Sequence, residues 1–312
     1  MRPTFTPGEV TVYSEPAEMA TLTRALRGAG RKIALVPTMG ALHAGHRELI
    51  KHARRIPGTS VVVSIFVNPL QFGPGEDLDS YPRSLRSDVD ACAAAGVEIV
   101  FAPGSAQMYP HGENQVKLDP GPLGDKLEGA SRPGHFAGML TVVAKLFNIV
   151  RPDCAFFGEK DYQQLVLVKR MVSELNLNVS VIGVPTVREH GGLALSSRNA
   201  YLSAPEREAA LALSAALTAG AYAGASGAGA VLAAAREVLA AVPEVRVAYL
   251  ELRGPDLSPA PARGDARLLL AARVGATRLI DNVAVRLGSD QARPRRLSNA
   301  GSSERTTLRR DG

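Results

Sequence analysis

Cysteine is scarce in this chain, and long apolar runs are missing from it. The 312 residues include two cysteines, which argues against a disulfide framework and fits the reducing cytoplasm. No apolar run reads as long enough to span a bilayer, and the first seven residues lack the apolar core of a signal peptide. We therefore expect a cytoplasmic protein with no membrane partner.

A dense positive charge is also lacking in the part of the chain that can fold. The net charge is +6, from 36 basic and 30 acidic residues. Half of the excess falls in segment 288–312, where six arginines stand against three acids, and this polar composition predicts a disordered tail. A nucleic-acid-binding protein usually shows a denser basic face, so we expect no nucleic-acid partner.

Short apolar runs alternate with helical patterns over the first part of the sequence. The runs at 33–36, 60–67, 97–101, 155–157 and 179–184 read as buried strands, with helical patterns between them. This alternation predicts an α/β fold with a parallel sheet and helices on both faces. In such folds, ligands bind outside the carboxyl ends of the strands.

After about residue 190 the pattern changes. Two alanine-rich helices, at 204–218 and 228–242, precede three short strands, which predicts a smaller α+β domain. A chain of this length that is 46% hydrophobic can bury a core in each of two domains. We expect a first domain at 1–189, a second at 190–287 and the tail at 288–312.

Two histidines stand where the first buried strand passes into a helix. His43 and His46 follow the turn residues Pro37 and Gly40. A helix N-terminus carries free N–H groups and favours phosphate, and Gly45 leaves room for a flat ring or a phosphate to approach the backbone. Surface histidines near helix starts are common, however. A zinc site would need further ligands at recognisable spacing.

Three polar residues lie just past a strand end: His43, Asn68 and Lys160. A parallel sheet brings such residues to one edge, although they are far apart in the sequence. The loop region 104–134 is rich in glycine and proline, and a connection of this length inside a compact domain is usually functional. We expect a nucleotide site at this edge.

Six motifs then follow one another along the chain. They are PTMGALHAGH at 37–46, SIFVNPLQF at 64–72, YPR at 81–83, LEGASRPGHF at 127–136, FGEKDYQQ at 157–164 and LSSRN at 195–199. With these motifs the sequence closely resembles the pantothenate synthetase (pantoate–β-alanine ligase) family, from about residue 10 to about 287. The resemblance implies a Rossmann-like nucleotide-binding domain of the class I synthetase type, with its HxGH element at His43 to His46.

The resemblance also implies a reaction. Pantoate, β-alanine and ATP would give pantothenate, AMP and pyrophosphate through a pantoyl adenylate, with Mg²⁺ on the phosphates and a homodimer as the assembly. The catalytic groups would be His46, His43, Lys160 and Arg198, acting by charge neutralisation. Among them, His46 would donate a proton or a hydrogen bond to the phosphates.

Further site residues are implied by the same motifs. ATP would contact Met39, Gly40, Ala41, Leu42, His43, Ala44, Gly45, His46, Gly158, Glu159, Lys160, Asp161, Val187, Leu195, Ser196, Ser197 and Arg198. Pantoate and β-alanine would contact Gln71, Gln164, Asn68 and Arg132, with Tyr81 and His135 nearby. Asp88 is a candidate Mg²⁺ ligand, and a solvated helix-face acid is the alternative. Asp161 would bind the ribose hydroxyls or act as a helix N-cap. Leu195 stands where the family also uses methionine.

Other functions fit parts of the pattern. The same HxGH scaffold serves nucleotidylyltransferases, which release a nucleotidylated product without a second acceptor. A noncatalytic nucleotide sensor or a nucleic-acid-binding module would show strong salt-dependent binding to RNA or DNA, and the mild charge of the folded part argues against it.

Overall fold

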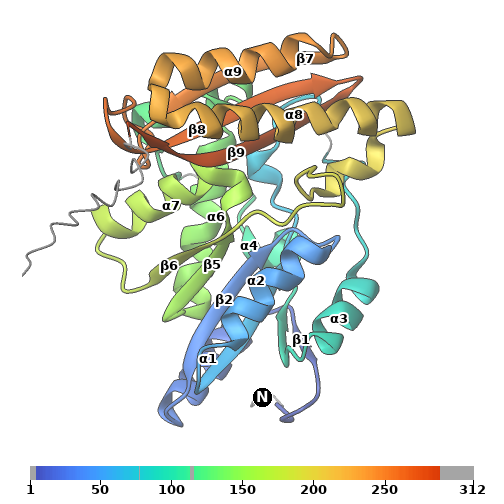
Figure 1. The fold of residues 1–312 in the computed structure, drawn as a ribbon. Coiled ribbons are helices and arrows are strands. Elements are labelled where there is room, and N and C mark those ends of the chain that lie inside the picture. Colours follow the sequence, from blue (N-terminus) through green and yellow to red (C-terminus); the bar gives the residue numbers. More distant parts are fainter. Residues whose placement is uncertain (1–4, 77, 113–115, 289–312) are drawn as a thin grey trace, which may run out of the picture.

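Six parallel strands form the larger of two sheets in the computed structural model, which describes residues 5–76, 78–112 and 116–288 (Figure 1). The strands are β1 (Thr11–Tyr13), β2 (Lys32–Thr38), β3 (Thr59–Ile65), β4 (Ile99–Phe101), β5 (Cys154–Gly158) and β6 (Ser180–Val184). Their order across the sheet is β1-β4-β3-β2-β5-β6. The predicted parallel α/β sheet is therefore confirmed, while the short edge strand β1 was not predicted.

Helices cover both faces of this sheet because its central strands are apolar on both sides. In β2, Ile33 and Leu35 join one hydrophobic cluster with α1 (Pro16–Gly28), α6 (His135–Val150) and α7 (Tyr162–Glu174). Ala34 and Val36 face the other way, toward α2 (Ala44–Arg54) and α3 (Leu85–Ala94). The loop region between β4 and α6 holds the short helices α4 (Ser105–Met108) and α5 (Glu128–Ser131).

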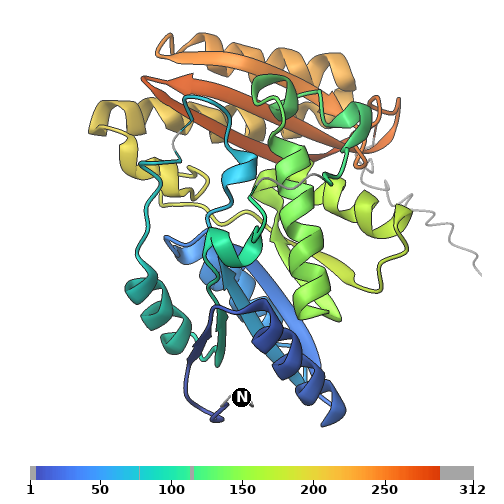
Figure 2. The ribbon, with the colours of Figure 1, turned by 180° about the vertical axis from the view of Figure 1, so that it is seen from behind.

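A three-stranded antiparallel sheet lies across the carboxyl end of the first one (Figures 1 and 2). It consists of β7 (Val245–Arg253), β8 (Gly264–Val274) and β9 (Thr277–Leu287), in that order. Leu268 and Leu270 of β8 pack in a cluster with α8 (Ala204–Tyr222) and α9 (Ala228–Ala240), whereas Leu269 belongs to the cluster of the first sheet. The second sheet and its helices thus have a cluster apart from the two that flank the first sheet, which agrees with a two-domain chain. The boundary at residue 189 stays a prediction.

The segment Ala204–Ser226 is long and apolar enough to cross a membrane by length and composition. The expectation that no run reaches this length was therefore wrong. The inward residues Ala210, Leu213, Ala216 and Leu217 are buried in the cluster with the second sheet, as expected of a core helix. The Arg-rich tail beyond residue 288 lies outside the described residues.

Candidate active site

The strand order changes direction between β2 and β5. From β2 the chain proceeds outward through β3 to β4, and it then returns to place β5 on the other side of β2. Ligands of open α/β sheets bind at such a switch point, outside the carboxyl ends of the strands. His43 follows β2, and Lys160 in the 3₁₀ turn η3 (Glu159–Asp161) follows β5. The predicted convergence of these two residues is confirmed, because both line one cavity of about 230 Å³.

The side chains of His43 and His46 cap the N-terminus of helix α2. Nδ1 of His43 accepts a hydrogen bond from the backbone N–H of Gly45 at 3.1 Å, and Nδ1 of His46 accepts from the N–H of His43 at 3.2 Å. A neutral imidazole that accepts at Nδ1 carries its proton on Nε2. Each ring therefore keeps one N–H donor, on Nε2, that these backbone contacts leave unused.

The structure gives a further reason for a glycine at position 45. A Cβ on Gly45 would lie 2.8 Å from Cε1 of His43. The side-chain position of this glycine is therefore filled by the His43 ring, while Gly45 also lines the cavity, so the approach of a ligand to its backbone stays a prediction. The two imidazoles stand 4.1 Å apart between centroids.

Both imidazoles are uncharged at neutral pH. Desolvation lowers the pKa of His46 to about 3, and at acidic pH a protonated His43 would add to this effect. Desolvation and the nearby ammonium of Lys160 lower the pKa of His43 as well. The neutral ring of His46 is thus suited to donate a hydrogen bond, and its expected role as a donor of a proton or a hydrogen bond to the phosphates stays a prediction. Positive charge comes from Lys160 and Arg198, which line the same cavity.

Asp161 supplies the negative charge beside this pair. Its Oδ1 lies 3.4 Å from Nζ of Lys160. Desolvation in the cavity favours the neutral acid, but Lys160 and Arg198 outweigh it and lower the pKa of Asp161. The carboxylate is therefore ionised and can accept hydrogen bonds. No side-chain cap bond joins it to α7, so the N-cap alternative lacks its usual contact.

Most residues expected at the site line this cavity. They are Met39, His43, Gly45, His46, Gln71, Tyr81, Arg132, His135, Gly158, Lys160, Asp161, Gln164, Val187, Leu195, Ser196, Ser197 and Arg198. Gly40, Ala41, Leu42, Ala44, Asn68, Asp88 and Glu159 are not among the lining residues.

Asn68 was expected to touch substrate, and the structure corrects this. Its side chain is 1% exposed, and Oδ1 accepts from the hydroxyl of Tyr109 at 2.6 Å. Its Nδ2 donates to Oε1 of Gln71 at 3.1 Å and to the carbonyl of Gly138 at 3.1 Å. Asn68 therefore orients Gln71, whose own Nε2 lies 2.9 Å from Sδ of Met39.

Asp88 was expected to hold a metal, and the structure gives its carboxylate other partners. Oδ1 accepts from the N–H of Leu42 at 2.7 Å and Oδ2 from the N–H of Ala41 at 3.0 Å. The side chain is 3% exposed, so it is no solvated helix-face acid either. Within residues 5–76, 78–112 and 116–288, no cluster of three or more His, Cys, Asp or Glu residues could hold a metal ion.

Arg132 is anchored at the edge of the cavity. Its guanidinium bonds both oxygens of Glu76, at 2.9 and 2.5 Å, and Nη1 lies 3.1 Å from Nε2 of His135. His135 donates from Nδ1 to the carbonyl of Gln71 at 2.8 Å, which leaves Nε2 to accept from Arg132. Desolvation and the charge of Arg132 lower the pKa of His135 to about 4. Nothing in the sequence pointed to Glu76, which lies 56 residues from its partner.

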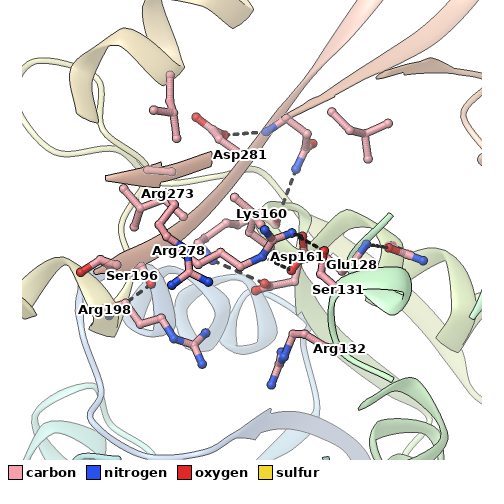
Figure 3. Close-up of a pocket in the computed structure, with 18 of the residues that line it drawn as sticks. Glu128, Ser131, Arg132, Lys160, Asp161, Ser196, Arg198, Arg273, Arg278 and Asp281 are labelled. Carbon is pink, nitrogen blue, oxygen red and sulfur yellow. Dashed lines mark hydrogen bonds and ion pairs between the residues drawn. The ribbon is translucent and has the colours of Figure 1, made fainter. Parts of the chain in front are cut away.

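A second cavity of about 470 Å³ continues from the first into the space below the small sheet. Arg132, Lys160, Asp161, Ser196 and Arg198 line both. Figure 3 shows Arg132 and Arg198 on opposite sides of this space, with Arg273 and Arg278 of the small sheet above them. The two cavities thus form one cleft between the sheets.

The small sheet also supports the strand end that carries Lys160. Nδ2 of Asn282 donates to the backbone carbonyls of Glu159 and Lys160, at 2.9 Å each. The Glu159 side chain turns away from the cavity and pairs with Arg267 at 2.9 Å, which explains why it does not line the site. A further ion pair joins Arg278 to Glu128 at 2.5 Å.

The family model described as pantoate-beta-alanine ligase matches residues 11–284. The chain belongs to the pantoate–β-alanine ligase family. It is 64% identical to the pantothenate synthetase of Mycolicibacterium smegmatis, over 92% of this chain and 91% of that protein. It is 65% identical to the enzyme of Saccharopolyspora erythraea, over 92% and 94%.

Solved structures of ligases of this family have the same fold. A pantothenate synthetase from Thermus thermophilus is 48% identical and superposes with a TM-score of 0.80, covering 88% of this chain and 99% of that one. A ligase from Francisella tularensis, solved with beta-gamma ATP and beta-alanine, is 35% identical with a TM-score of 0.73, covering 88% and 97%. The fold and the enzyme class expected from the motifs are therefore confirmed.

Proposed function

We propose that this chain condenses pantoate with β-alanine, and that ATP is cleaved to AMP and pyrophosphate. The observation that supports it most is the position of the His43 and His46 pair. Two neutral imidazoles, each with an N–H on Nε2, line the same cavity as Lys160 and Arg198. Such a set of donors suits a polyphosphate, and the proposed reaction requires no protein nucleophile.

ATP is needed because the pantoate carboxylate has no good leaving group. A carboxylate does not acylate an amine at neutral pH, so pantoate first attacks the α-phosphorus of ATP, and pyrophosphate leaves. The β-alanine amine then attacks the acyl carbon of the pantoyl adenylate, and AMP leaves as the new amide forms. Negative charge develops on the phosphoryl oxygens, where Lys160, Arg198 and the imidazole N–H groups can stabilise it.

The remaining cavity residues would orient the reactants. Gln71 and Gln164 suit pantoate, because an amide can donate to its carboxylate and accept from its hydroxyl. Asp161 would accept from the ribose hydroxyls, and Ser196 and Ser197 would add hydroxyl contacts to the phosphates. Arg132, neutralised by Glu76, suits the boundary between pantoate and the cavity from which β-alanine would enter.

Mg²⁺ is part of this proposal as a companion of ATP. The described residues provide no cage of carboxylates, which fits an ion held mainly by phosphate oxygens and water. When bound there, the ion would neutralise charge on the departing pyrophosphate. The homodimer implied by the family resemblance and the cytoplasmic location expected from the composition are also proposals.

The test is exchange of labelled pyrophosphate into ATP. Exchange should require pantoate and proceed without β-alanine. His46→Asn keeps an acceptor near the position of Nδ1 and removes the N–H on Nε2, so it should lower the exchange rate on the order of a hundredfold. His52→Asn, on the same helix but away from the cavity, should leave it unchanged.

Two results would contradict the proposal. Exchange that does not depend on pantoate would mean that a different group is activated. An adenylylated product that accumulates in the presence of β-alanine, with no amide formed, would favour the nucleotidylyltransferase alternative.

A further inference from the structure

In the turn between β2 and α2, the four consecutive N–H groups of residues 40–43 donate hydrogen bonds to side chains. The N–H of Gly40 donates to Oγ1 of Thr38 at 3.3 Å, and the N–H of His43 donates to Nδ1 of His46. The N–H groups of Ala41 and Leu42, between them, both donate to the Asp88 carboxylate. Each of the four amides from Gly40 to His43 is thus held by a side chain.

The backbone of this turn is strained where Asp88 holds it. Ala41 has φ +50°, in the left-handed region that residues with a Cβ rarely adopt, and Gly40 has φ +87°. A Cβ on Gly40 would lie 3.0 Å from Oδ2 of Asp88, so the carboxylate is packed directly against the turn. Strain of this kind persists only where surrounding groups impose it.

We propose that Asp88 is a positioning residue for the reaction: its carboxylate fixes the strained turn and so sets the direction of the two imidazoles. This inference rests on the proposed function of His43 and His46. Asp88 lies in α3, on the chain segment after β3, and it does not line the cavity. Its effect must therefore pass through the turn.

This role predicts different effects of an Asp88 substitution on ATP and on pantoate. Released from Asp88, the turn would shift His43 and His46, which we place at the phosphates of ATP. The pantoate ligands Gln71 and Gln164 belong to η1 (Pro69–Gln71) and α7, whereas the hydrogen bonds of Asp88 go to Ala41, Leu42 and Ser84. A loss of Asp88 should therefore affect ATP much more than pantoate.

The experiment compares Asp88→Asn and Asp88→Ala with the parent enzyme in steady-state assays. Asp88→Asn keeps one acceptor and fills the same space, so it is the variant most certain to fold. A displacement of about 1 Å can cost about a hundredfold in rate, so we expect kcat/KM for ATP to fall on the order of tenfold to a hundredfold. The KM for pantoate should change less than about threefold. Asp90→Asn, on the exposed side of the same helix, is the matched control.

A second substitution tests the mechanism itself. Glycine adopts φ +50° without steric cost, so Ala41→Gly should restore part of the activity lost in Asp88→Asn and in Asp88→Ala. A carboxylate that merely stabilised the fold would lower the melting temperature and affect both substrates alike, without this rescue.

Three results would overturn the inference. One is an unchanged kcat/KM for ATP in Asp88→Asn. Another is an equal loss for ATP and pantoate. The third is activity restored by excess Mg²⁺ and not by Ala41→Gly, which would identify Asp88 as a metal ligand. These outcomes are distinct from failure of the proposed function, because that failure would already appear as exchange without pantoate in the parent enzyme.

Discussion

Gly138 lets helix α6 touch the turn that carries Gln71. A Cβ at this position would lie 2.0 Å from the carbonyl oxygen of Leu70 and 2.7 Å from the backbone nitrogen of Gln71. A carbon and a carbonyl oxygen in contact are about 3.3 Å apart or more, so Gly138→Ala must separate the helix and the turn by roughly 1.3 Å. Overpacking of this size costs about 1–3 kcal/mol, and the better helix propensity of alanine offsets up to about 1 kcal/mol.

The displaced turn would carry Gln71 away from the cavity. It would also weaken the bond from Asn68 to the carbonyl of Gly138, which helps to orient Gln71. Because a shift of about 1 Å can cost about a hundredfold, we expect Gly138→Ala to lower kcat/KM for pantoate on the order of a hundredfold. Binding of ATP alone, measured by calorimetry, should change little, because His43 and Lys160 lie on other elements.

Gly229→Ala is the matched control, since a Cβ at that helical glycine meets nothing within 4 Å. The variants should be compared under identical conditions, with urea unfolding to show that both remain folded. A folded Gly138→Ala protein with the parent kcat/KM for pantoate would show either that Gln71 does not bind pantoate or that its turn tolerates the displacement.

Two further predictions concern the small sheet and the buried histidines. Asn282→Asp removes the two hydrogen bonds to the carbonyls of Glu159 and Lys160 but keeps the acceptor for Arg267, so kcat should fall about tenfold as Lys160 loses its support. The exposed control Asn148→Asp should keep the parent kcat. If Asn282→Asp also kept it, Lys160 would not depend on support from the small sheet. The lowered pKa values of His46 and His135 make the folded state bind fewer protons than the unfolded one, so stability is full above about pH 6.5 and falls as the pH drops toward 4. Between pH 7 and pH 5, His135→Gln should remove up to about 2 kcal/mol of the pH-dependent loss in the free energy of unfolding, measured in urea, and an identical pH slope in the variant would count against the neutral imidazole.

The sequence predicted those parts of the site that depend on local pattern. A buried strand followed by a turn and a helix is visible in the order of residue types, and a parallel sheet then brings His43 and Lys160 together. At the helix start, the sequence indicated Gly45 but not its contact with the His43 ring, because the rotamer of His43 cannot be read from the spacing of residues.

The direction of polar side chains could not be predicted. Asn68 and Glu159 follow strand ends as site residues do, yet one is buried and the other turns to Arg267. Asp88 reads as an ordinary helix-face acid until the turn 47 residues earlier is packed on it. Such pairings depend on tertiary contacts between distant segments, and the hydrophobic periodicity of a single sequence carries no information about them.

The shared wall of the two cavities has a consequence for inhibitors. Lys160, Asp161 and Arg198 line the nucleotide side and the interdomain side alike. An elongated small molecule that extends from one cavity into the other, with acidic groups facing Lys160 and Arg198 and a hydroxyl facing Asp161, would bind these side chains from both cavities and link the small sheet to the large one. Selectivity over other nucleotide-binding enzymes would then come from the half of the compound that lies beneath Tyr249 and Arg278, where no nucleotide is expected.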